Sequence, residues 1–108
     1  MTKAEINKEI NRLITQLTTV YKPEKIILFG SVLTGKVSPD SDIDLLIIKR
    51  NVPHRGIDRI QEVDRILERR GIAIDILVYK PEEIKAALDD GDPFISYIIK
   101  KGKVVYDQ

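Results

Sequence analysis

Cysteine is absent from the 108 residues of this chain, and histidine occurs once. Without a thiol there can be no disulfide, no thiolate nucleophile and no zinc-finger site. No apolar stretch approaches the roughly 20 residues that a membrane-spanning helix requires, and the amino terminus lacks the apolar core of a secretory signal. These absences predict a soluble, cytoplasmic protein that does not contact a membrane.

An excess of charge of either sign is also missing, because 18 lysine and arginine residues nearly balance 17 aspartate and glutamate residues. A general DNA- or RNA-binding protein usually carries a long-range positive field, so nucleic acid is not expected as a partner. A chain of this length forms a single domain, residues 1–108, without room for a second core. A large substrate must therefore be met at the surface.

Apolar periodicity divides the chain into alternating helices and strands. A capping-box pattern at Thr2 and Glu5 opens a helix that apolar residues extend to Pro23. Further helices are predicted within 57–70, 81–88 and 93–101, and strands within 25–29, 42–48, 72–79 and 103–106. This order predicts an α/β or α+β fold, a mixed β-sheet with flanking helices.

Two carboxylates stand at the start of the second predicted strand. Asp42 and Asp44 would point to the same face, since side chains alternate along a strand. The apolar strand 25–29 ends at Gly30, and ten residues separate Ser31 from Asp42. Like charges so close repel one another unless a cation lies between them, and Mg²⁺ is the natural cation for hard oxygen ligands beside a phosphate site. The pattern predicts a metal and nucleotide site.

A third acid, Asp75, interrupts the apolar segment 72–79. An unpaired charge buried there would cost several kcal/mol, so Asp75 is expected to have a partner; the alternative is an edge-strand residue that faces water. If its strand neighbours that of Asp42 and Asp44, three carboxylates can hold one or two Mg²⁺ ions, which would grip the oxygens of a phosphoryl displacement.

Donors for a triphosphate are expected in the turn after the first strand. The backbone N–H groups at Gly30 and the hydroxyl of Ser31 can supply them, and Lys36 can add a positive charge. Residues 30–37 nearly match the phosphate-loop motif of ATPases. That interpretation fails because Val37 lacks the required hydroxyl and Pro39 obstructs the helix that should follow.

This arrangement resembles the signature of the nucleotidyltransferase superfamily related to DNA polymerase β. That signature consists of Gly-Ser, ten further residues, Asp-x-Asp and a later aspartate. The length is similar to that of the minimal nucleotidyltransferases, the MNT proteins, which pair with HEPN-domain toxins. The resemblance implies transfer of AMP from ATP, in the toxin pairs to a tyrosine of the partner, with the MNT protein as antitoxin. It also implies that Gly30 and Ser31 hold the triphosphate, that Asp42 and Asp44 bind Mg²⁺, and that Asp75 completes the metal site and helps to deprotonate the acceptor.

One position departs from this pattern. Many members carry arginine three residues after the serine, where this chain has Thr34, so Lys36 would have to replace that charge. A catalytically weak or inactive module that neutralises a partner by contact is therefore the alternative. Transfer to a small molecule such as an aminoglycoside is expected to need a further domain.

Other residues carry weaker expectations. His54 is expected in an exposed loop, and Phe94 and Tyr97 could meet a partner helix. Homo-oligomerisation and the preferred nucleotide base stay open.

Overall fold

A computed structural model describes residues 2–35, 42–68 and 72–108, and four strands within these ranges form one mixed sheet. The strands are β1 (Lys25–Phe29), β2 (Ile43–Ile48), β3 (Ile74–Tyr79) and β4 (Lys103–Asp107), and their spatial order is β3-β2-β1-β4. β1 pairs antiparallel with β2 and β4, whereas β2 and β3 are parallel. The predicted mixed sheet is confirmed.

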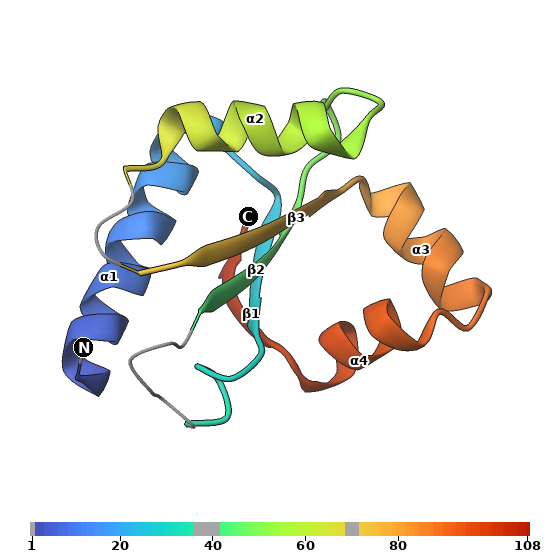
Figure 1. The fold of residues 1–108 in the computed structure, drawn as a ribbon. Coiled ribbons are helices and arrows are strands. Elements are labelled where there is room, and N and C mark those ends of the chain that lie inside the picture. The colour runs from blue at the N-terminus through green and yellow to red at the C-terminus, as the bar shows by residue number, and fades with distance from the viewer. Residues whose placement is uncertain (1, 36–41, 69–71) are drawn as a thin grey trace.

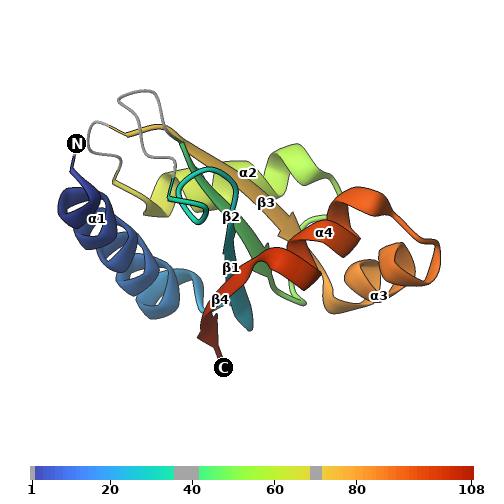
Figure 2. The ribbon, with the colours of Figure 1, turned by 90° about the horizontal axis from the view of Figure 1, so that it is seen from below.

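Helices cover both faces of this sheet (Figure 1). They are α1 (Lys3–Gln16), which continues as a π-helical turn η1 (Leu17–Tyr21), α2 (Gly56–Ile66), α3 (Pro81–Asp89) and α4 (Pro93–Lys101). α1 and α2 lie on one face and α3 and α4 on the other; Figure 2, seen from below, shows the sheet between these layers. No helix in the described ranges is long and apolar enough to cross a membrane.

The alternation of side chains along the central strand β2 explains the two layers. Ile43, Leu45 and Ile47 pack in the core beneath α1 and α2. Leu46 and Ile48 point the other way, toward the apolar side chains of α3 and α4. A strand that is apolar on both faces must be covered on both to keep its side chains from water.

Val20 and Ile57, which belong to the apolar periodicity that predicts the first two helices, are exposed instead. Val20 is 61% exposed and lies in the π-helical turn, where the change of helical pitch shifts the phase of the apolar stripe. Ile57 is 56% exposed because the inner face of α2 follows Arg59 and Val63, four residues apart, and Ile57 falls off that line. The helices were predicted correctly, but these two orientations were not.

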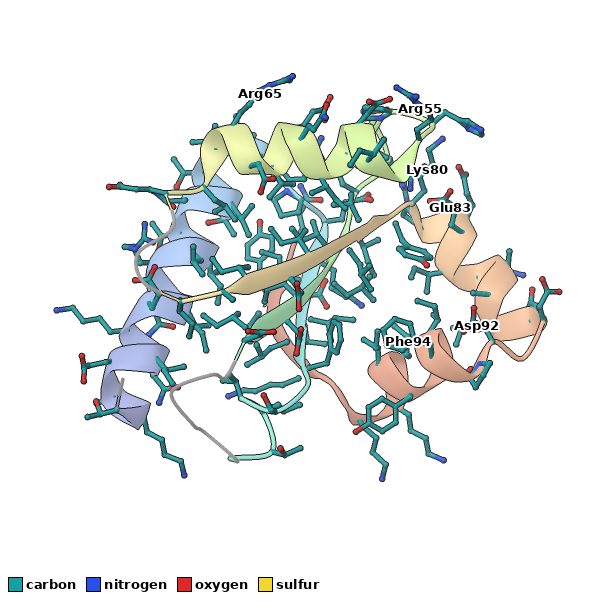
Figure 3. All side chains as sticks on the ribbon, in the orientation of Figure 1. Arg55, Arg65, Lys80, Glu83, Asp92 and Phe94 are labelled. Atoms are coloured by element: carbon teal, nitrogen blue, oxygen red, sulfur yellow. The ribbon has the colours of Figure 1, made fainter. Side chains whose placement is uncertain are left out.

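Arg59 is the buried charge that binds the layers together at the edge of the sheet. Only 4% exposed, its guanidinium donates hydrogen bonds to the backbone carbonyls of Pro53 (2.6 Å), Val78 (3.0 Å) and His54 (3.1 Å). It also donates two to the carboxylate of Glu83, at 2.6 and 3.2 Å, near the start of α3 (Figure 3). The network joins α2, β3 and α3, and the His54 side chain is exposed as expected.

Candidate functional site

Gly30 lies directly against Asp44. Phe29, the last residue of β1, pairs with Asp44 across the antiparallel ladder, so the next residue, Gly30, enters its turn beside that carboxylate. Gly30 has a φ of +83°, and a Cβ built on it would overlap Oδ2 of Asp44 and lie 3.0 Å from Cγ. Only glycine combines this backbone conformation with so close an approach. The turn and the start of β2 therefore lie at the same end of the sheet (Figure 1).

Asp75 lies beside Asp44 on the neighbouring strand. The two residues are in register in the parallel pairing of β2 and β3, and, after burial, the charge of Asp75 is the next largest cause of the raised pKa of Asp44. This confirms that the strand of Asp75 neighbours that of Asp44. β3 is an edge strand, however, and Asp75 is exposed. The expectation of a buried charge was wrong, because the strand order leaves this side of β3 open to water.

The electrostatics of Asp44 reflect its burial and the charges of two neighbouring carboxylates. Burial is the largest cause that raises the pKa of Asp44, followed by the charges of Asp75 and then Asp42, and together they bring it to about 6. A divalent cation would offset this repulsion, and carboxylate oxygens are the ligands that Mg²⁺ prefers. The donor chemistry of the cluster thus fits a magnesium ion.

Full ligation by the three acids stays a prediction. Within residues 2–35, 42–68 and 72–108, no three acidic or histidine side chains are grouped with the geometry of a metal site. Asp42 and Asp44 are half-buried, and Asp75 is exposed at the edge. Mutually repelling carboxylates with this freedom would have to turn toward a common ion for all three to bind it.

The turn from Gly30 to Gly35 is closed by its own hydrogen bonds. The amide of Thr34 donates to the Gly30 carbonyl (3.3 Å), and the Thr34 hydroxyl donates to the Ser31 carbonyl (3.0 Å). Ser31 itself is exposed, with its side chain open to a ligand. Lys36, proposed as a phosphate ligand, lies outside the described residues.

A cavity of about 280 Å³ adjoins this turn, and no sequence motif predicts it. Its walls come from the turn and from the end of α4: Phe29, Gly30, Leu33, Thr34, Tyr97, Lys101 and Gly102. From its place in the last turn of a helix, Lys101 is expected only to complement the helix dipole. No spacing rule links it to Gly30, because the two lie far apart in the chain and meet only in the fold.

Comparison with known proteins connects this geometry to a family. Residues 10–106 match the model of the family described as "Nucleotidyltransferase domain". Over 87 residues, 77% of this chain, the sequence is 39% identical to "Putative protein adenylyltransferase MJ1305" of Methanocaldococcus jannaschii. Over 76 residues, 68% of this chain, it is 32% identical to "Putative protein adenylyltransferase MJ0141" of the same organism.

The aligned regions cover 58% of the first relative and 72% of the second. The fold also resembles the crystal structure of a "putative nucleotidyltransferase" from Sulfolobus solfataricus, with a TM-score of 0.66 and 18% identity. That alignment covers 98% of this chain and 84% of the solved one, so the likeness concerns the whole fold. The family match spans the Gly30 turn and the three acids Asp42, Asp44 and Asp75, and the chain belongs to the nucleotidyltransferase domain family.

Proposed function

We propose that this protein is a magnesium-dependent enzyme that transfers AMP from ATP to a hydroxyl group of a partner protein. The observation that carries the proposal is the contact of Gly30 with Asp44, which joins a turn suited to phosphate with a cluster of three acids. Membership of the nucleotidyltransferase family supports the reaction class. The names of the two relatives favour a protein as acceptor.

The residues of the chain divide into two roles in this reaction. Backbone N–H groups at Gly30 and the Ser31 hydroxyl would bind the triphosphate, and Asp42, Asp44 and Asp75 would hold Mg²⁺. When bound, Mg²⁺ neutralises phosphate charge and polarises the phosphoryl group. These groups thereby orient the α-phosphorus of ATP toward the acceptor.

In the transfer step, the acceptor oxygen bonds to the α-phosphorus while the bond from that phosphorus to the bridging oxygen breaks. Pyrophosphate leaves, and the proton of the acceptor hydroxyl passes to a carboxylate. Asp75 suits this last role because it is exposed at the edge of the sheet, where a hydroxyl on a large partner can reach it.

The surface next to the site suits a protein acceptor. On α4, Phe94 is 50% exposed and Tyr97 is 53% exposed, and Tyr97 lines the cavity beside Gly30. Exposed aromatic side chains are enriched where proteins meet. Our proposal extends to a tyrosine of a HEPN-domain toxin as acceptor, to a role as antitoxin, and to the cytoplasm as compartment.

Labelled ATP tests the reaction directly. The wild-type protein and the product of its neighbouring gene are incubated with Mg²⁺ and ATP labelled at either the α- or the γ-phosphate. AMP transfer moves the α-label and not the γ-label to the partner. The double variant D42N/D44N should abolish labelling, whereas D90N, which changes an exposed acid at the end of α3, should retain it. Failure of the wild-type protein to label the partner would contradict the proposal.

A binding module is the second candidate function, and Thr34 at the position of the family's arginine favours it. Such a protein would bind its partner and suppress its toxicity without transferring AMP. The two functions separate in the same experiment. If D42N/D44N still binds the partner and neutralises it, and no α-label is transferred by either protein, contact alone explains the antitoxin role.

A further inference from the structure

The cavity beside the Gly30 turn adjoins the acidic cluster. Gly30 contacts Asp44 and also forms part of the cavity wall, opposite the end of α4. Because a water molecule occupies about 30 Å³ in the liquid, a volume of about 280 Å³ accepts a group of several atoms rather than a lone ion. A ligand that reaches the carboxylates past Gly30 can therefore extend into this cavity.

The charge of the cavity wall favours an anion. Of the described residues that line it, Lys101 alone is charged at neutral pH. No carboxylate in the described part of the chain forms an ion pair with Lys101, so its ammonium group is available to a ligand. The neighbouring Lys100 is exposed and does not line the cavity. Of these two adjacent lysines, Lys101 lines the cavity and Lys100 does not.

The end of α4 makes this lysine necessary for any anion bound there. The last carbonyls of a helix carry partial negative charge, which repels an anion unless a cation lies between. Lys101 is the final residue of α4. On the opposite wall, the Thr34 hydroxyl is neutral and donates to the Ser31 carbonyl, so it cannot provide the missing charge.

We propose that Lys101 binds the β- and γ-phosphates of ATP in this cavity. The inference rests on the proposed function and assigns the group that holds the pyrophosphate portion. In this arrangement the α-phosphate lies at the acidic cluster, past Gly30, and the leaving group lies between the turn and α4. Lys101 then supplies the positive charge that Thr34 lacks.

Binding measurements test the assignment without any acceptor. Calorimetry compares AMP with an ATP analogue that has a methylene bridge between the α- and β-phosphates, both with Mg²⁺. K101Q should bind the analogue about tenfold more weakly than the wild type, the loss typical of a charged hydrogen bond. Its affinity for AMP should stay within twofold, because AMP does not reach the cavity. K100Q, the matched control on the same helical turn, should leave both affinities unchanged.

Two rescue variants separate charge from packing. K101R keeps the cation on the same wall and should retain most of the affinity for the analogue. T34R combined with K101Q returns a cation from the opposite wall and should recover part of the loss. In turnover with the partner, K101Q should raise KM for ATP more than it lowers kcat.

Three outcomes would overturn the assignment of Lys101. These are equal affinity of K101Q and wild type for the analogue, equal weakening for AMP and the analogue, and a loss in K101R as large as in K101Q. If the wild-type protein bound neither nucleotide, the proposed function itself would fail and this inference with it. If K101Q matched a wild type that binds and transfers AMP, the inference alone would fail.

Discussion

Gly30 and Asp44 are packed so closely that a Cβ on Gly30 would overlap the Oδ2 atom of Asp44. The φ of +83° at Gly30 sends the chain into its turn at this point, and the pairing of Phe29 with Asp44 holds the two strands in place. A change at either residue must therefore affect the other. The turn proposed to bind phosphate and the central carboxylate form one unit.

We predict that G30A lowers both stability and activity. An alanine in the left-handed region costs about 1 to 2 kcal/mol, and its Cβ would also displace the Asp44 carboxylate. G91A is the matched control, because Gly91 has a φ of +72° but no atom within 4 Å of a built Cβ. Urea unfolding should show a loss in both variants, and AMP transfer should fall at least tenfold in G30A only. Equal activity of G30A and G91A would contradict the proposed coupling.

A second prediction concerns the pH dependence of stability that Asp44 imposes. Its pKa of about 6 in the folded protein lies above the ordinary value of 3.8. The folded state thus binds a proton more tightly than the unfolded state does. The stabilisation from the protonated carboxyl is fully present below pH 3.8 and is lost as the pH rises through about 6. At pH 8 the charged form of Asp44 therefore lowers the free energy of unfolding.

The variant D44N should therefore be more stable than the wild type at pH 8 in EDTA and inactive in AMP transfer. We expect a gain of roughly 1 kcal/mol or less, because Asp44 is only partly buried and solvent screens its charge. The gain should shrink below pH 5. D75N should give a smaller gain, and the double variant less than the sum, since both changes relieve the same repulsion. Additive gains would show that the two acids do not interact.

The layers of this fold could be predicted from the sequence because each depends on local pattern. Strand β2 is apolar on both faces except at its start, and this pattern alone is enough to place Asp44 at an end of the sheet. The spacing to Ser31 then indicates that the turn and the acid meet. Asp75 shows the limit of this reasoning: its strand pattern predicts burial, but strand order decides exposure, and β3 is at the edge.

The environments of two side chains, Arg59 and Lys101, could not have been predicted from the sequence. Arg59 is a polar residue near the start of an amphipathic helix, where exposure is the usual outcome. It is buried because its hydrogen-bond acceptors come from the loop at 53–54, from Val78 and from Glu83. Lys101 likewise gains its proposed role from a cavity whose walls come from residues 29–34 and 97–102, which lie far apart in the sequence. Such environments depend on tertiary packing, which local periodicity does not encode.

The network of Arg59 leads to a prediction about stability alone. R59M should lower the free energy of unfolding by about 2 kcal/mol, because it removes the guanidinium that pairs with the partly exposed carboxylate of Glu83 and leaves the buried Val78 carbonyl without this donor. R55M is the control, since Arg55 is exposed and, among the described residues, its side chain pairs with Asp58 in the first turn of α2. Urea unfolding should show no resolvable loss for R55M. Neither variant should change the affinity for ATP, and a weaker affinity in R59M would indicate that the network also shapes the site.

Magnesium should stabilise the wild-type protein through the acidic cluster. A ligand that binds only the folded state at 100 times its Kd adds about 2.7 kcal/mol. The melting temperature in Mg²⁺ should thus rise well above that in EDTA, and more so at pH 8 than at pH 5, where protonation of Asp44 competes with the metal. D42N/D44N should lose this increase, whereas D90N, which changes an exposed acid remote from the cluster, should keep it. An equal increase in D42N/D44N and the wild type would locate the bound cation elsewhere on the protein.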